Sequence, residues 1–206
     1  MLFHLISARY PVSAGTILLH GEPITGLRPH EINRKGLARS FQVTNLFHRM
    51  TVFENVRCAA LWSMGYRYSF WRRVEGLDDA NARAAEIVER VGLAARSDVP
   101  AGILSYAEQR ALEIGIAIAG GADVILLDEP TAGMSRTETE AAVALIRRVT
   151  EGRTLLIVEH DMSVVFGLAD RISVLVYGKV VATGTPEEIR GNAKVREAYL
   201  GAAAHA

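Results

Sequence analysis

The stretch Val124-Ile-Leu-Leu-Asp128-Glu129-Pro130 decides the fold class of this chain. Its four apolar residues predict a strand buried on both faces, as strands of parallel sheets are. Two carboxylates follow at the carboxyl end of that strand, where open α/β sheets bind their ligands. One carboxylate there suits Mg²⁺, and the second suits a water that attacks a phosphate. Because Asp and Glu before Pro also simply end many strands, the heptapeptide alone leaves both interpretations open.

A second strand-end motif follows 31 residues (160 − 129) after Glu129. The apolar run Thr154–Val158 predicts another strand, and it leads directly into Glu159-His160-Asp161-Met162. One helix and one strand separate the two motifs, which places Glu129 and His160 at the same edge of a parallel sheet. A histidine there suits the charge that develops on a transferred phosphate, although a lone strand-end histidine is more often a surface residue.

Helical and strand patterns alternate around these motifs, which predicts an α/β core with a largely parallel sheet. Ser135 and Glu138 form a capping box for a helix that ends near Val149. The helical stretch from about Thr51 to Asp98 is expected to form a lobe inserted into this core. Further expected elements are helices at 2–9, 29–35, 78–91 and 108–119, strands at 16–19 and 38–41, a hairpin at 172–182 and a last short helix capped by Thr185.

Composition argues against several classes of protein. Lys+Arg and Asp+Glu are both 23, so net charge gives no reason to expect nucleic acid or an anionic membrane as a partner. The single cysteine, Cys58, cannot form an internal disulfide or a cysteine-rich metal site. No apolar run reaches the roughly 20 residues that a membrane helix needs, and the first residues lack the features of a signal peptide. Any membrane role is therefore expected to run through a partner.

Two weaker motifs complete the set. Leu104-Ser-Tyr-Ala-Glu-Gln109 precedes a helix, where Ser105 is expected to be the N-cap. Because the N–H groups, dipole and hydroxyl at a helix N-terminus also suit a phosphate, a structural and a functional interpretation both stand. Gln42 follows Phe41 at the end of a short strand and means little by itself.

Taken in order, these motifs resemble those of the ABC transporter ATPases. Gln42, Leu104–Gln109, Val124–Pro130 and His160 match the Q-loop, signature motif, Walker B strand and switch histidine, and residues 131–135 match the D-loop. The resemblance covers essentially the whole chain. It implies a P-loop NTPase-like core with a mostly parallel sheet, formed by residues 1–48 and 104–206, and an inserted helical subdomain at residues 49–103.

The mechanism of that family implies a role for each matching position, with ATP and Mg²⁺ as the ligands. Asp128 would hold Mg²⁺ together with Gln42. Glu129 would polarise the attacking water, and His160 would contact the γ-phosphate. The signature residues would close onto ATP held by a second ATPase subunit, because these proteins work as head-to-tail dimers. Those residues are Ser105, Tyr106, Ala107, Glu108 and Gln109.

The resemblance also implies partners and a location. The chain would bind transmembrane permease subunits at the cytoplasmic face of the bacterial inner membrane, and it would serve a periplasmic solute-binding protein indirectly. No nucleic acid is expected. Five aromatic residues after Gln42 would either form the docking surface for a permease or simply pack the helical lobe. They are Trp62, Tyr66, Tyr68, Phe70 and Trp71.

Finer features are similar to subunits that import branched-chain amino acids. They are the segments 38–42, 46–47 with 50–56, and 159–162, and the ending 185–189 with 198–201. Importers of urea or short-chain amides are the competing interpretation, because the periplasmic and membrane subunits set the substrate.

The chain departs from the family pattern in one large respect. The 206 residues contain no G-x-x-x-x-G-K-[ST] phosphate-binding loop, and Met1 falls at or just past the place where that loop would end. Ala107 also replaces the second signature glycine, and Ile116 stands where many relatives have arginine. A homodimer of the printed chain is expected not to hydrolyse ATP, whereas a heterodimer with an intact partner would retain one site. The sheet edge is expected to be exposed.

Three hypotheses follow. In the first, the chain is an ATPase subunit whose working form begins upstream. In the second, it is a catalytically incomplete regulatory or decayed subunit that acts through a complete partner. The third, an ABC-type ATPase of DNA repair or chromosome structure, is set aside because the long heptad segments of that class have no counterpart in the short helical lobe.

Overall fold

The computed structural model describes residues 1–39, 46–66 and 74–197. The chain forms two compact units, Met1–Val158 and Glu159–Ala206. Gln42 and the aromatic residues Tyr68, Phe70 and Trp71 lie outside the described residues. In the described part of the chain, no helix is long and apolar enough to cross a membrane.

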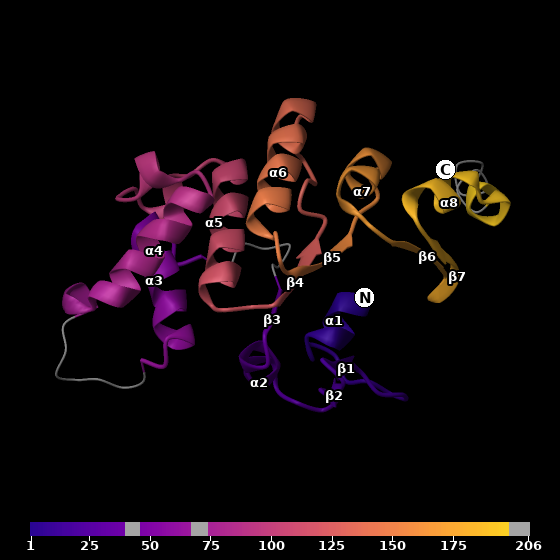
Figure 1. Cartoon of the computed structure of the whole chain (residues 1–206), viewed down its shortest axis with the longest axis horizontal. Coiled ribbons are helices and arrows are strands. Elements are labelled where there is room, and N and C mark those ends of the chain that lie inside the picture. The colour runs from indigo at the N-terminus through magenta and orange to yellow at the C-terminus, as the bar shows by residue number, and fades with distance from the viewer. Residues whose placement is uncertain (40–45, 67–73, 198–206) are drawn as a thin grey trace. The chain divides into compact units, whose positions relative to one another are not determined.

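A parallel sheet of three strands forms the centre of the first unit (Figure 1). Its order is β3 (Leu37–Arg39), β4 (Val124–Asp128) and β5 (Thr154–Val158). The register pairs Ala38 with Ile125 and Asp128 with Val158, so β4 and β5 end at the same edge. The predicted parallel α/β core is therefore confirmed, together with the alignment of the two strand ends.

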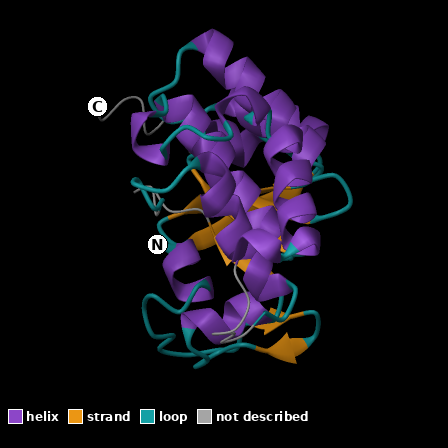
Figure 2. Cartoon of the chain, turned by 90° about the vertical axis from the view of Figure 1, so that its left-hand side faces the viewer, coloured by secondary structure: helices purple, strands orange, loops and turns teal. Residues whose placement is uncertain are grey.

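Helices lie on both sides of this sheet (Figures 1 and 2). On one side, Leu126 of β4 packs in a cluster with Phe3 and Ile32. Alternate residues of a strand face opposite ways, so Ile125 and Leu127 face α5 (Tyr106–Ala119) and α6 (Arg136–Val149). The three inner residues of β4 are at most 1% exposed, as the apolar run predicts. In β5, by contrast, Leu156 and Val158 are about two-fifths exposed.

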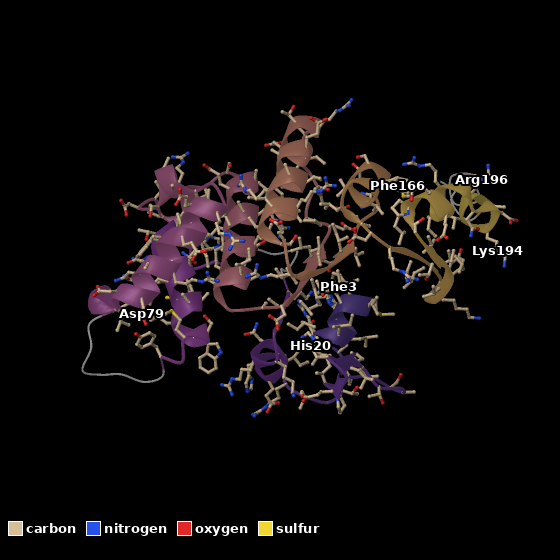
Figure 3. The ribbon with its side chains drawn as sticks, viewed as in Figure 1. Phe3, His20, Asp79, Phe166, Lys194 and Arg196 are labelled. Carbon is tan, nitrogen blue, oxygen red and sulfur yellow. The ribbon has the colours of Figure 1, made fainter. Side chains whose placement is uncertain are left out.

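The N-terminal segment covers the Leu126 side of the sheet. It contains α1 (Leu2–Ile6), β1 (Leu18–Leu19), β2 (Glu22–Pro23) and α2 (Pro29–Arg34). The first helix has no side-chain cap, as predicted, and it ends earlier than expected because Ala8 adopts a left-handed conformation (φ 53°). Phe3, labelled in Figure 3, anchors α1 to the core at 2% exposure.

The helical lobe contains α3 (Val52–Ser63) and α4 (Asp78–Arg90), with short 3-10 turns at Val74–Gly76, Ala94–Arg96 and Ala101–Ile103. Thr51 and Glu54 form a capping box at the start of α3. Both helices contact each other and α5. Trp62 is 42% exposed and lies under the Arg34 guanidinium at 4.5 Å, whereas the Tyr66 hydroxyl donates to Asp79.

The second unit contains α7 (Met162–Leu168), β6 (Ile172–Val176), β7 (Lys179–Gly184) and α8 (Pro186–Gly191). The predicted hairpin is confirmed, and its turn at Tyr177 and Gly178 uses two positive φ angles, as tight hairpin turns do. The predicted cap of the last helix is confirmed as a capping box of Thr185 and Glu188. Phe166, labelled in Figure 3, packs under the Arg190 guanidinium at 4.4 Å.

Candidate functional site

The carboxyl end of β4 holds the two carboxylates that the sequence singles out. Asp128 is the last residue of the strand, and Glu129 follows in a left-handed conformation with φ 47°. The Glu129 N–H donates to the Val158 carbonyl at 2.9 Å, so it continues the parallel ladder for one step. A left-handed glutamate is strained, and such strain is concentrated at functional sites. This geometry supports a functional interpretation of Glu129 over a plain strand ending.

The Asp128 carboxylate forms a buried ion pair with Arg39, the last residue of β3. Arg39 Nη2 donates to Asp128 Oδ2 at 2.9 Å, and the two side chains are 3% and 18% exposed. The partners are 89 positions apart in sequence. The sequence analysis did not predict this contact, because nothing in the segment 38–42 links Arg39 to a residue 89 positions away. Neighbouring parallel strands were the only signal that pointed to it.

Arg39 also ties the site to α1. Its Nη1 lies 3.0 Å from His4 Nδ1 and donates to Ser7 Oγ at 2.9 Å. The Phe3 ring lies 5.8 Å from the guanidinium carbon. Burial, and next the positive charge of Arg39, lower the pKa of His4. One arginine thus joins α1, β3 and β4 around the Asp128 carboxylate.

The donor set at β4 suits Mg²⁺ only in one mode of binding. Within residues 1–39, 46–66 and 74–197, no group of three or more His, Cys, Asp or Glu side chains could hold a metal. Mg²⁺ in phosphate-transfer sites is commonly bound by one or two carboxylates, with water and substrate phosphate as the other ligands. Asp128 fits that role as a single carboxylate. Gln42, its expected companion, lies outside the described residues.

The N-terminus of α5 holds the signature residues. Ser105 is the N-cap, as predicted, and its Oγ accepts from the Glu108 N–H at 3.3 Å. Glu108 Oε2 accepts from the Ser105 N–H at 2.8 Å. That hydrogen bond, assisted by Arg96, holds the pKa of Glu108 below its usual range. Ser105 is exposed and Tyr106 is 43% exposed, whereas Ala107 and Gln109 are partly buried. The helix start therefore presents a polar, outward-facing surface.

The structure contains a buried ion pair one turn further along α5 that the sequence-based prediction of the site did not include. Arg110 Nη1 donates to Glu113 Oε2 at 2.7 Å, and both side chains are 7% exposed. Arg110 also donates to the Tyr106 hydroxyl at 2.8 and 3.1 Å. Burial alone would lower the pKa of Arg110, but the hydrogen bonds to Tyr106 and Glu113 outweigh it and raise that pKa. Two charged residues within an apolar helical pattern were the signal for this pair.

His160 belongs to the second unit, at the entry to α7. Its backbone N–H donates to the Glu159 carboxylate at 3.2 Å, and its Nδ1 lies 3.9 Å from the same oxygen. Asp161 caps the helix by accepting from the Ser163 N–H, and the Ser163 side chain and backbone lower the pKa of Asp161. The first unit brings Asp128 and Glu129 together, and His160 occupies the strand-to-helix turn that follows β5.

These features define the class of protein. The model of the ABC transporter family matches residues 1–132, and the chain belongs to that family. The ending matches a second model, that of the branched-chain amino acid ATP-binding cassette transporter, at residues 179–205.

Relatives narrow the class further. The chain is 38% identical over 211 residues to the high-affinity branched-chain amino acid transport ATP-binding protein LivG of Escherichia coli, covering 98% of this chain and 82% of the relative. It is 37% identical to the corresponding protein BraF of Pseudomonas aeruginosa, with the same coverage. Its close homologues are thus ATP-binding proteins of branched-chain amino acid transport.

Solved structures agree with this assignment. An ATP-binding cassette of an ABC transporter superposes with a TM-score of 0.79 at 26% identity, over 96% of this chain and 81% of the other. A nucleotide-free cassette from an ABC transporter gives 0.78 at 25% identity, with the same coverage. The predicted ABC ATPase fold is confirmed.

Proposed function

We propose that the chain is the ATP-hydrolysing subunit of an importer for branched-chain amino acids. The observation that carries the proposal is the carboxyl end of β4, where a strained Glu129 follows an Asp128 fixed by a buried ion pair. The 38% identity to a branched-chain amino acid transport protein over nearly the whole chain supports the choice of substrate.

In this proposal, Asp128 and Glu129 divide the work at one site. Asp128, with Gln42, would hold Mg²⁺, which would supply positive charge to the phosphates of the substrate ATP. Glu129 accepts a proton from the water whose oxygen bonds to the γ-phosphorus, while the bond to the β-phosphate oxygen breaks and ADP leaves. His160 donates a hydrogen bond to the γ-phosphate as its charge develops.

The exposed start of α5 serves a different site. Ser105 and the following N–H groups would close onto ATP held by a second ATPase subunit in a head-to-tail dimer. The outward-facing position of Ser105 and Tyr106 supports this role. The two subunits would sit at the cytoplasmic face of the bacterial inner membrane through permease subunits, downstream of a periplasmic solute-binding protein. The helical lobe, with its exposed Trp62, would receive the permease.

Reconstitution of the transporter tests the proposal. The native complex is purified from its source, the intact mass of this subunit and its binding of Mg·ATP are measured, and leucine uptake is followed in proteoliposomes. Glu129→Gln is expected to lower ATP turnover and uptake by about 100-fold or more, because a general base contributes that much. Glu151→Gln, an exposed glutamate in the turn after α6, is the matched control and should change neither rate. Equal rates for Glu129→Gln and the wild type would refute the proposal.

A catalytically incomplete subunit is the second candidate. The observation that favours it is the existing engagement of Asp128 by Arg39, which places a cation on the carboxylate proposed for Mg²⁺. In this case, the intact mass matches 22.4 kDa and Mg·ATP does not bind to the isolated subunit. Turnover of the complex then depends on Ser105 and is insensitive to Glu129→Gln. If the proteoliposomes take up urea or a short amide and not leucine, the proposed substrate is wrong, but the proposed ATPase role is unaffected.

A further inference from the structure

The first unit contains a cavity that includes neither Asp128 nor Glu129 in its wall, although Ala107 and Glu108 of the signature segment line part of it. Its volume is about 230 Å³, and it lies between the end of α4, the first half of α5, the end of β4 and α6. Apolar side chains make most of its wall. They include Ala111, Ile114, Leu127, Pro130, Ala142 and Leu145. Pockets for drug-sized ligands begin at roughly 300 Å³, so this cavity has room only for a small molecule.

The wall contains one buried ion pair. Arg110 and Glu113, both among the lining residues, are 6% and 8% exposed. Arg110 Nη1 and Glu113 Oε2 lie 2.7 Å apart, and the two residues are three positions apart on α5. Two further carboxylates, Glu108 and Glu138, also line the cavity, but each accepts the capping hydrogen bond of its own helix. The wall therefore contains one guanidinium, three carboxylates and an extended apolar surface.

This combination selects one kind of occupant. A hydrocarbon would leave the ion pair beside an apolar group, and burying charges in that way costs free energy. An anion would meet three carboxylates and one guanidinium. A zwitterion places its carboxylate near Arg110 and its ammonium near Glu113, whereas an aliphatic side chain matches the remaining wall.

We infer that the cavity binds a free α-amino acid with an aliphatic side chain, with leucine as the representative ligand. The carboxylate of the amino acid is recognised by Arg110 and its ammonium by Glu113. The side chain contacts Leu127 of β4 and Leu145 of α6. Asp128 and Glu129, the residues proposed for ATP hydrolysis, take no part in this binding.

Position suggests what such a ligand does. Some lining residues follow α4 in the helical lobe, whereas others belong to the core, on strand β4 and on helix α6. A bound amino acid would join these two parts and favour the arrangement in which they are close. In an importer, such binding would let the amino acid already inside the cell slow further uptake. This regulatory role rests on the proposed function. Binding itself stands on the cavity alone.

Calorimetric titration of the purified full chain, without nucleotide, tests the inference. L-Leucine is expected to bind saturably at one site. 4-Methylpentanoate, which lacks the ammonium, should bind at least about tenfold more weakly, since a hydrogen bond to a charged group is lost. Isoamylamine, which lacks the carboxylate, should fall between them because carboxylates outnumber the guanidinium. Absence of leucine binding, or tightest binding of 4-methylpentanoate, would overturn the inference.

Two substitutions on α6 locate the site. Ala142→Phe fills the cavity and should abolish leucine binding, whereas Ala144→Phe, on the exposed side of the same helix, should leave it unchanged. Equal binding by both variants would place leucine elsewhere and refute the assignment. If Ala142→Phe does not fold, as circular dichroism would show, the ligand series still decides the question. ATP turnover of the reconstituted complex reports on the proposed function, so the two failures are distinguishable.

Discussion

The carboxyl end of β4 and the N-terminus of α5 carry the two halves of the proposed chemistry. A contact between distant residues holds the first in place, whereas a contact between residues close in sequence holds the second. Asp128 depends on Arg39, 89 positions away and buried. Ser105 depends on Glu108, three positions away in an exposed capping box. The first site exists only when the sheet and α1 have assembled, whereas local sequence alone specifies the second. The two sites should therefore respond differently to substitution.

Removing Arg39 is the change with the largest expected effect on this comparison. Arg39→Ala leaves the Asp128 carboxylate without its buried cation and removes three contacts with α1. The free energy of unfolding is expected to fall by about 3 kcal/mol, the lower end of the range for breaking buried pairs, because Asp128 is partly exposed. Urea unfolding measures the change.

Arg136→Ala is the matched control for that experiment. Arg136 pairs with Glu140 at 3.1 Å on the surface of α6, with side chains 92% and 66% exposed. Its loss should cost about 0.5 kcal/mol or less, as for other exposed i,i+4 pairs. Equal losses for the two variants would show that the Arg39–Asp128 pair contributes no more than a surface pair, and the contrast between the two sites would fail.

Ser105→Ala probes the second site and has a smaller expected effect on stability. Loss of an N-cap costs about 1 kcal/mol. Ser135→Ala removes the same kind of capping box from α6 and should cost a similar amount. Only Ser105→Ala should also lower ATP turnover in the reconstituted complex. If both variants lower turnover equally, Ser105 is a helix cap and has no part in nucleotide contact.

Glu129→Gly separates backbone strain from chemistry at the first site. A left-handed conformation costs a non-glycine residue about 1–2 kcal/mol, and glycine removes that cost. Glycine also gains freedom in the unfolded chain, worth up to about 1 kcal/mol, so the net stabilisation should be about 0.5 kcal/mol. The variant should nevertheless lose ATP turnover. Lower stability of Glu129→Gly, measured by urea unfolding, would show that the glutamate side chain stabilises the turn.

The local features of both sites could be predicted from the sequence. Capping boxes depend on residues three positions apart, so Ser105, Ser135 and Thr185 were recognisable as N-caps. The apolar run of β4 predicted its burial, and the alternation of helices and strands predicted a parallel sheet in which β4 and β5 end at the same edge.

Contacts between distant segments could not be predicted in this way. Arg39 and Asp128 meet because β3 and β4 are neighbouring strands, and no local sequence pattern around either residue indicates that they pair. The exposure of Leu156 and Val158 in β5 likewise depends on what packs against their face of the sheet, since the composition of β5 resembles that of β4. The cavity beside Arg110 arises from the packing of four elements, and a one-dimensional pattern does not specify packing.

The pH dependence of stability gives the smallest and most selective test, because residues 104–119 contain no histidine whereas the first site contains His4. Burial, then Arg39, the N-terminal ammonium and Arg9, lower the pKa of His4 against a weaker opposing effect of Asp128. A lowered pKa means that the unfolded chain binds the proton first as pH falls below about 6.5. The free energy of unfolding should therefore decline as pH falls from 7.5 to 5.5.

Carboxylates with lowered pKa values, such as Glu31 at about 2, affect stability only at lower pH. His4→Gln should flatten the decline, and the exposed His48→Gln should not. A decline that His4→Gln leaves unchanged would mean that the proton is taken up elsewhere, and that α1 does not sense the charge of Arg39.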